Sequence, residues 1–557
     1  MTRFVKGALP FFWGMLFCSA VAQAAGTALP GQIEKQFQKP PEMRATEPSP
    51  VVVPEADQPA PSNAQDIRFM LTQLVIEGAT VYSEDALLAD YKSRLNTEVA
   101  LSDIYQIASA LTAKYRNAGY ILSRVVVPAQ SVEGGMVHLK VIEGYVAEVI
   151  IEGADGDQRK LVESYAAHIK QSRPLTNAVM ERYLLLMNDL PGAFARAAIK
   201  SSGSEPGASE MTVQFFQQKV QGGLSLDNLG GKQLGPLRIS GDVELNSVLG
   251  WQESTALRAV SSGNERLNYL SLSHDERIGS EGGKLNLSAY LVRSKPEDIL
   301  FIPLDEKTSS DSAALTYSYP LIRSRAQNLY LRGALSAYNG TTDIFGVEIT
   351  RDHIRALRLG ATYDLADSFH GVNLLDIELS QGINGLGSSD NHDTMLSRFN
   401  GRVDFTKTVL YAARLQSLAP KWSVLAAVNA QYAFTDLLSP ELFSFGGEQF
   451  GRGYDPSELV GDKGAAMKLE LRYTGTLPTK FVSSYTAYGF YDIGKVWQRS
   501  SDALVSSESA ASAGLGLRMS LGQYVSGFIE VAKPLTRDVF AEGNRDVRGY
   551  AGLSIRF

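Results

Sequence analysis

The chain has 557 residues, which leaves room for several domains, and its hydrophobic content of 44% and mean hydropathy of -0.09 are ordinary for a soluble protein. Its formal net charge of -7 at pH 7 does not suit nucleic-acid binding as a main task, so we expect no nucleic-acid partner.

The first 24 residues have the features of an export signal. Arg3 and Lys6 precede an apolar stretch from Ala8 to Val21, and Ala22-Gln23-Ala24 supplies a small-x-small cleavage pattern. The alternative is a retained membrane helix, which is disfavoured because Pro10 interrupts a segment that is already short for a span. We therefore predict a signal peptide over residues 1–24.

Removal of the signal also removes Cys18, the only cysteine. Phe17 stands where lipoprotein attachment would need a small residue, so that alternative is rejected. The mature chain then has 51 basic and 60 acidic residues, a net charge of -9, and neither a disulfide nor a thiolate metal site. No later run approaches the roughly 18 apolar residues of a membrane helix. Such an exported chain is periplasmic, secreted or an outer-membrane barrel.

Residues 25–65 read as a linker, with prolines at positions 40, 41, 48, 50, 54, 59 and 61 that favour extended conformations. One island interrupts the linker, because Pro30 opens a possible two-turn helix over 31–37. Ile33 and Phe37 share one face of that helix at i, i+4 spacing. So short a helix is marginal alone, and we expect it to dock on another part of the chain.

Residues 66–219 repeat one order of elements twice, β-α-α-β-β in about 75 residues each time, which indicates two small α+β domains over 66–144 and 145–219. The elements expected in the first are a strand over 69–76, a helix from Ser83 to Leu95, a helix that begins at Ser102, and strands over 121–127 and 136–142. Those expected in the second are a strand over 146–151, helices over 158–169 and 177–188, and strands over 194–199 and 211–216.

Residues 220–557 alternate with a period of two and are broken about every ten residues by Gly, Asn, Asp and Ser. Met467, Leu469 and Leu471, for example, oppose Lys468 and Glu470. A soluble β-sandwich is the alternative. However, segment after segment has a polar opposite face, and a closed barrel in lipid explains greasy outer and wet inner faces. At roughly 20 residues per strand and connection, we predict a transmembrane β-barrel of about 16 antiparallel strands.

The residues that could carry chemistry form no convincing catalytic constellation. The six histidines are scattered without metal-ligand spacing, and the sequence has neither a phosphate-binding glycine loop nor a G-x-S-x-G elbow. We therefore expect no catalytic residues, no metal and no cofactor. A barrel hydrolase that assembles Ser, His and Asn from different strands stays open as an alternative.

A glycine-rich segment from Phe445 to Pro456 lies between strand-like stretches and carries Arg452. It is either an exposed loop or a loop folded into the barrel lumen, where its glycines permit close approach to the wall. An arginine partly removed from water needs an anionic partner, and a carboxylate matches its planar fork. Asp492 is one such partner, because it faces inward if Tyr491 and Ile493 face lipid.

These residues resemble a known family. The segment 447–454 is similar to the V-R-G-Y/F motif on the sixth extracellular loop of the barrel-assembly (Omp85) superfamily, with Gly451 in place of the usual Val or Ile. Residues 490–494 fit the F-x-D-x-G wall motif to which that family's arginine is locked. The residues that the resemblance assigns to this lock are Arg452, Gly453, Tyr454 and Asp492. The whole mature chain resembles outer-membrane transporters (TpsB) of the two-partner secretion pathway, the haemolysin and filamentous-haemagglutinin secretors.

The resemblance implies two periplasmic polypeptide-transport-associated (POTRA) domains and an N-terminal helix that plugs the resting pore. The motifs concerned are Gly119-Tyr120, Val127-Pro128-Ala129-Gln130 and Ile142-Glu143-Gly144 in the first domain, and Leu190-Pro191-Gly192 in the second. The partner-binding residues expected in the first domain are Tyr120, Val125, Val127 and Gln130. Ile33 and Phe37 are the residues expected to seat the plug.

The implied function is a translocation pore that secretes a large exoprotein (a TpsA-type adhesin, haemolysin or similar) through the barrel without ATP. The implied partners are that exoprotein, outer-membrane lipid and the barrel-assembly machinery that inserts the chain. One alternative is an insertase of the same superfamily, although two periplasmic domains are few for that task. Another is a diffusion porin or barrel enzyme, which would have no use for residues 66–219.

Overall fold

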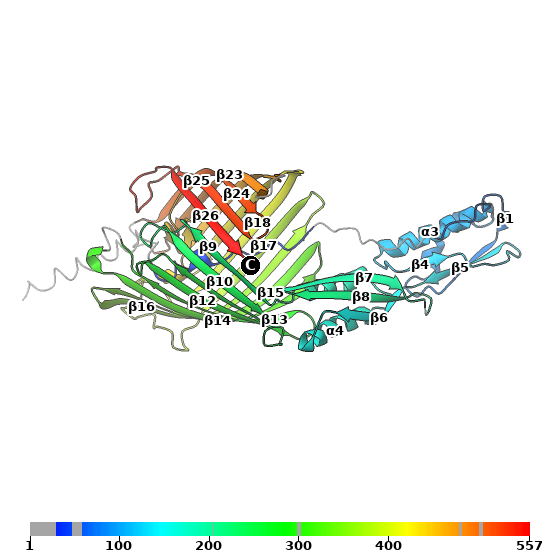
Figure 1. The fold of residues 1–557 in the computed structure, drawn as a ribbon, viewed down its shortest axis with the longest axis horizontal. Helices are drawn as coiled ribbons and strands as arrows, with labels where there is room; N and C mark the ends of the chain where they lie inside the picture. Colours follow the sequence, from blue (N-terminus) through cyan, green and yellow to red (C-terminus); the bar gives the residue numbers. More distant parts are fainter. Residues whose placement is uncertain (1–28, 47–57, 204, 298–301, 478–481, 501–504) are drawn as a thin grey trace, which may run out of the picture.

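A computed structural model of the chain describes residues 29–46, 58–203, 205–297, 302–477, 482–500 and 505–557. The expected export signal, and part of the expected linker at 47–57, lie outside the described residues. The described part forms a closed barrel and two small domains that extend from one end of it (Figure 1). Among the helices in these ranges, none is long and apolar enough to span a membrane.

Domain 1 lies farthest from the barrel (Figure 1). Its elements are β1 (Arg68–Leu71), β2 (Gln73–Glu77), α2 (Glu84–Leu88), η3 (Lys92–Arg94), β3 (Thr97–Ala100), α3 (Leu101–Asn117), β4 (Arg124–Val126) and β5 (Met136–Ile142). β5 is the centre of a three-stranded sheet, parallel to β2 and antiparallel to β4, and β1 pairs with β3 separately. Ile104, Leu111 and Tyr115 of α3 are fully buried on this sheet, as their helical spacing predicts.

Two predicted strands of domain 1 differ from the structure. The strand expected over 69–76 is two strands, because the chain is held at Thr72 by hydrogen bonds from its N–H and hydroxyl to the carbonyls of Gly135 and Gly134. The strand expected over 121–127 is reduced to β4, and the residues before it form a turn. Both shortenings occur where side-chain or turn hydrogen bonds replace the sheet ladder.

The helices of domain 1 are also bounded differently from the prediction. Ser83 caps α2 as expected, through the N–H of Ala86, but α2 ends at Leu88 and not at the predicted Leu95. η3 and strand β3 follow, and neither was predicted. α3 begins before Ser102, because the Asp103 carboxylate accepts a hydrogen bond of 2.9 Å from the N–H of Ala100 and so closes the first turn.

Domain 2 repeats the same layout next to the barrel. Its elements are β6 (Tyr145–Glu152), α4 (Gly156–Gln171), α5 (Asn177–Asn188), β7 (Ala193–Ser201) and β8 (Ala208–Gln217), in the predicted order. The sheet order is β6-β8-β7, with β6 parallel and β7 antiparallel to β8. Val146, Met211 and Val213 of the sheet and Tyr165 and Met187 of the helices are buried in one core.

The barrel has sixteen antiparallel strands, as predicted. They are β9 (Val220–Asp227), β10 (Arg238–Asn246), β11 (Ser254–Ser261), β12 (Leu267–Ile278), β13 (Gly283–Ser294), β14 (Lys307–Arg323), β15 (Gln327–Ile344), β16 (Val347–Ala366), β17 (Gly371–Gly382), β18 (Thr406–Ala419), β19 (Trp422–Ala433), β22 (Lys463–Gly475), β23 (Val482–Trp497), β24 (Ser507–Leu521), β25 (Val525–Pro534) and β26 (Arg548–Arg556). β26 closes the barrel on β9, where Gly552 to Arg556 lie opposite Asp227 to Gly223.

The alternation of apolar and polar residues along the barrel strands matches the outer and inner faces of the barrel. Met467, Leu469 and Leu471 of β22 are exposed on the outer surface, whereas Glu470 between them is buried inside. Tyr491 and Ile493 of β23 likewise face outward, and Asp492 between them is buried. Closure of the barrel gives every strand a hydrogen-bonded neighbour on both sides. The barrel can therefore place an apolar outer face in lipid and a polar inner face in water.

The connection between β19 and β22 is the longest between neighbouring barrel strands in the part of the chain that the structure describes. The long loop (434–462) joins β19 to β22 and contains η5 (Ser439–Glu441) and a small hairpin of β20 (Phe443–Phe445) and β21 (Leu459–Gly461). A further short helix, η4 (Ile302–Leu304), precedes β14. The long loop folds back inside the barrel, where Phe445 and Tyr454 are buried with residues of the wall.

Candidate functional site

Arg452 of the long loop forms the predicted ion pair with the barrel wall. Its Nε and Nη2 donate to Asp492 Oδ2 and Oδ1 of β23 at 2.9 and 2.8 Å, and its Nη1 donates to Glu470 Oε2 of β22 at 2.6 Å. The guanidinium also lies 3.5 Å over the ring of Phe490. Arg452 is 5% exposed and Asp492 0%, so a planar, charged fork is enclosed between a bidentate carboxylate and an aromatic face.

The backbone of the loop adds to the same carboxylate. Asp492 Oδ2 also accepts hydrogen bonds of 3.1 Å from the N–H groups of Gly451 and Arg452. Gly451 has a φ of +94°, and a Cβ there would lie 2.7 Å from the ring of Phe445. The Phe445 ring therefore fills the space of the branched side chain that the resemblance led us to expect at 451.

Gly453 and Tyr454 complete the contact of the loop with the wall. A Cβ on Gly453 would lie 2.7 Å from Ser512 Cβ, so this position has room for glycine only. The Gly453 N–H donates to Ser512 Oγ at 3.2 Å, and the Tyr454 hydroxyl donates to the Ala511 carbonyl at 3.1 Å. The structure thus brings together all four residues expected in the lock.

The N-terminal turn (30–37) lies inside the barrel, but it is not the two-turn helix that the sequence predicts. It is a turn that ends in a single 3-10 element, η2 (Glu34–Phe37). Ile33 and Phe37 nevertheless point to the same side, where they pack on Val260, Val292 and other inward residues of the wall. Tertiary contacts therefore replace the second turn of helical hydrogen bonds.

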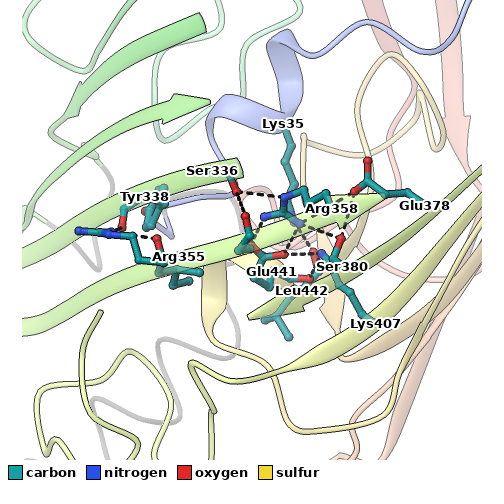
Figure 2. Close-up of polar contacts among 12 residues, drawn as sticks. Lys35, Ser336, Tyr338, Arg355, Arg358, Glu378, Ser380, Lys407, Glu441 and Leu442 are labelled. Atoms are coloured by element: carbon teal, nitrogen blue, oxygen red, sulfur yellow. Dashed lines mark hydrogen bonds and ion pairs between the residues drawn. The ribbon is translucent and has the colours of Figure 1, made fainter. Parts of the chain in front are cut away.

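The N-terminal turn and the long loop are joined to each other. Gln32 Nε2 donates to the carbonyls of Ser439 and Leu442 at 2.5 and 3.4 Å, and Lys35 Nζ donates to the same Leu442 carbonyl (Figure 2). The Gln449 amide reaches the carbonyl of Gln38 just after the turn. These are side-chain contacts, and no strand pairing joins the described residues of the two segments.

A charged cluster between the long loop and the wall is absent from our sequence predictions. Glu441 of η5 accepts from Arg358 Nη2 of β16 at 2.6 Å and lies 2.7 Å from Lys407 Nζ of β18 (Figure 2). Arg358 Nη1 also donates to Ser380 Oγ at 2.9 Å. Our sequence predictions named none of these residues, and nothing in the sequence indicated Glu441 as the partner of Arg358 and Lys407.

Beside these segments lies a cavity of about 640 Å³. Charged and polar side chains from three parts of the chain line it. They include Glu34 and Lys35 of the N-terminal turn and Gln38 just after it, Arg332, Arg358, Asp376, Glu378 and Lys407 of the wall, and Glu441 and Gln449 of the long loop. The described residues include no group of three His, Cys, Asp or Glu side chains arranged to hold a metal ion.

Ion pairs at the foot of the barrel fix domain 2, and our sequence predictions missed them. Arg323, at the end of β14, donates from Nε and Nη2 to both carboxylate oxygens of Asp189 at 2.7 and 2.8 Å. Glu281, in the turn before β13, accepts from Tyr183 Oη at 2.8 Å and from Arg182 Nη2 at 3.2 Å. The residues come from distant parts of the chain, so no spacing reveals them.

The residues expected to bind a partner in domain 1 are only partly exposed. The side chains of Val125 and Val127 are buried in the domain core, and Tyr120 is half-buried with its ring 6.0 Å from that of Tyr115. The Gln130 side-chain amide donates from Nε2 to the His138 carbonyl and accepts at Oε1 from the His138 N–H, both at 2.7 Å. A partner at this place would therefore meet backbone rather than these side chains.

Comparison with known proteins gives the family of the chain. A family model described as haemolysin secretion/activation protein ShlB/FhaC/HecB matches residues 207–519, and a POTRA domain model of the ShlB type matches residues 69–144. The heme/hemopexin transporter protein HuxB of Haemophilus influenzae (strain 86-028NP) is 23% identical over 486 residues, 85% of this chain and 85% of its own. The outer membrane transporter CdiB of Escherichia coli is 25% identical over 493 residues, 84% of this chain and 79% of its own. A solved structure of CdiB from Escherichia coli has a TM-score of 0.72 at 19% identity, with 100% of both chains covered, which shows a common fold.

Proposed function

We propose how this chain works from the premise that it belongs to the haemolysin secretion/activation family ShlB/FhaC/HecB. It is an outer-membrane transporter of the two-partner secretion pathway, and it secretes a partner exoprotein. The barrel lies in the outer membrane, and the POTRA domains lie in the periplasm. The family is one of transporters, and we propose no enzymatic step.

The exoprotein passes through the lumen of the barrel, in our proposal. One observation carries this step: the two segments that fill the lumen, the N-terminal turn and the long loop, are held to the wall by side-chain contacts, whereas the wall itself is one closed ladder. Both segments can therefore leave without breaking the barrel. We propose that Ile33 and Phe37 seat the plug and that Arg452, Gly453, Tyr454 and Asp492 lock the loop.

The wall suits the passage of an unfolded chain because its charges are mutually neutralised. Arg332 of β15, for example, donates to Asp376 Oδ2 at 2.6 Å and to Glu378 Oε2 at 3.3 Å. Such a surface offers hydrogen bonds to the polar backbone of a passing chain but no large field of one sign that would hold it.

Capture of the exoprotein takes place on the periplasmic domains. The sheet orders β2-β5-β4 and β6-β8-β7 leave edge strands in both domains, and an extended chain can add to such an edge through main-chain hydrogen bonds without strict sequence demands. The periplasm offers no ATP, so we propose that progressive folding of the exoprotein outside the cell drives its transport outward. Outer-membrane lipid surrounds the barrel, and the barrel-assembly machinery inserts it.

The first test is deletion of this chain's gene from its native host, followed by a comparison of the proteins in the medium. We expect one large exoprotein to disappear and to return on complementation. A medium that is unchanged by the deletion would refute secretion as the function of this chain.

A second test concerns capture by the POTRA domains. Deletion of residues 66–219 should abolish export of that exoprotein while the barrel still inserts, measured as a heat-modifiable band in outer-membrane fractions. Normal secretion by a variant that is inserted at the wild-type level would remove the capture step.

A further inference from the structure

The side chain of Gln58, at the end of the linker, pairs with the edge of the domain 1 sheet. Its Nε2 donates to the Val127 carbonyl at 3.2 Å, and its Oε1 accepts from the Val127 N–H at 2.9 Å. A side-chain amide carries one acceptor and two donors in a plane, much as a peptide group does. Gln58 therefore imitates, at one residue, the pairing that a neighbouring strand would make.

Val127 lies at the place where another strand would be added. β4 is an edge strand, and its Arg124 and Val126 lie opposite Ile142 and Lys140 of β5. The Val125 N–H points to the other side, because it donates to Thr112 Oγ1 of α3 at 2.9 Å.

Val127 directly follows β4, and its N–H and C=O are bonded to the Gln58 side chain rather than to β5. It presents both an N–H and a C=O, which are the two groups that an incoming strand needs.

The contact of Gln58 with Val127 is weak, because it consists of two side-chain hydrogen bonds at the protein surface. Residues 58–60 are exposed and lie outside any strand, so no ladder of backbone bonds supports the two side-chain bonds. Hydrogen bonds of exposed side chains compete with water and contribute little each. An extended segment that bonds to Val127 through its own backbone makes the same two bonds with groups that are already held in an extended conformation, and it can displace a single exposed amide.

We propose that Gln58 is a resident competitor at the exoprotein-binding edge of domain 1. In the resting chain it occupies the N–H and C=O of Val127, and an extended segment of the exoprotein takes its place as an added strand. The residue of that segment that faces Val127 is not proline, because it must donate as well as accept. This inference rests on the proposed function, and it names the point of capture and the group that is displaced there.

The test measures affinity on the full-length protein in detergent micelles. The probe is the purified N-terminal third of the exoprotein that the deletion strain fails to secrete. Gln58→Ala removes both bonds, and Gln58→Glu keeps the shape but removes the donor and sets a carboxylate against the Val127 carbonyl. We expect Gln58→Ala to bind the probe about fivefold more tightly than the wild type, since two weak bonds no longer compete. Gln58→Glu should also bind more tightly than the wild type, because its carboxylate repels the Val127 carbonyl.

Gln73→Ala is the matched control, because Gln73 is an exposed glutamine on β2, the opposite edge of the same sheet. It should leave the affinity unchanged. Hydrogen exchange supplies the second readout: the Val127 amide should exchange faster in Gln58→Ala than in the wild type, and bound probe should protect it in both.

Unchanged or weaker binding by the two Gln58 variants would overturn the inference, because Gln58 would then be either irrelevant or part of the binding site. A probe that binds without protecting the Val127 amide would overturn it as well, since capture would then lie elsewhere. Failure of the proposed function is separate and would be seen earlier, as a deletion strain that loses no exoprotein.

Discussion

Replacement of Arg452 by alanine is the sharpest test of the lock between the long loop and the wall. It removes a guanidinium that is 5% exposed and that makes three short hydrogen bonds, two to Asp492 and one to Glu470. Glu470 keeps ion pairs with Arg472 and Arg518. Asp492 has no second ion pair among the described residues, and it is left as an uncompensated buried charge.

The free-energy cost of Arg452→Ala follows from this difference between Glu470, which keeps other ion pairs, and Asp492, which keeps none among the described residues. Removal of one partner of a buried ion pair costs about 3–5 kcal/mol. We take the low end, about 3 kcal/mol, because the loop N–H groups of residues 451 and 452 still donate to Asp492. If that cost falls on the docked loop, the ratio of docked to undocked loop falls by about 150-fold.

The assay is amide hydrogen exchange of the full-length protein, with the exoprotein in the medium as the functional readout. We expect protection across the long loop to fall by about two orders of magnitude and secretion to fall more than membrane insertion. Asp492→Ala should have the same effect, and the charge swap Arg452→Asp/Asp492→Arg should restore part of it. Wild-type exchange and secretion in both single variants would refute the lock.

Three further predictions concern other parts of the chain. The double variant Ile33→Ala/Phe37→Ala loosens the N-terminal turn and should raise the resting ion conductance in planar membranes, because two buried anchors of the plug are lost. Arg323→Ala or Asp189→Ala removes one side of the paired fork at the foot of the barrel and should make domain 2 more accessible to protease. Burial alone would raise the pKa of Glu143, but hydrogen bonds from neighbouring groups outweigh it and lower that pKa. Its ionised form therefore stabilises domain 1 above the pKa of the unfolded chain, about 4.3, and the contribution is lost as the pH falls through the lowered folded value.

Each of these has a control or a contrary result. Conductance equal to that of the wild type would show that the N-terminal turn does not limit the resting pore. The pair Arg323→Ala/Asp189→Ala should lose little beyond the single variants, and additive losses would mean that the two side chains act separately. Glu143→Gln should flatten the acid limb of domain 1 unfolding, measured by the melting temperature against pH, and a parallel limb would contradict the assignment.

The barrel could be predicted from the sequence because alternation reports directly on two different solvents. Met467, Leu469 and Leu471 meet lipid, and a one-residue slip would bury all of them together, so the pattern is strict. The small domains were harder. Strand β3 was missed because its four residues pair with β1 across a sequence gap, and its own pattern is too short to show a period.

The lock could be predicted because its residues stand in two compact motifs, whereas the other contacts of the site could not. Glu441 meets Arg358 across 83 positions, and Asp189 meets Arg323 across 134, with neither pair in a recognisable motif. The shared face of Ile33 and Phe37 predicted correctly that the N-terminal turn docks on another part of the chain, but the two-turn helix predicted there was wrong. Helix propensity over a few residues carries no information about the barrel wall, and contacts with that wall decide the conformation of this segment.

The two segments in the lumen differ in how far along the chain their partners lie, and this bears on the order of assembly. Arg452 finds Glu470 and Asp492 within 18 and 40 residues, whereas Gln32 finds Ser439 only across 407. Nearby contacts have a small loop-closure cost, so the C-terminal hairpins can form around the long loop early. The N-terminal turn is therefore expected to dock after the long loop, and a barrel caught midway in assembly would have its loop docked but its lumen not yet filled by the turn.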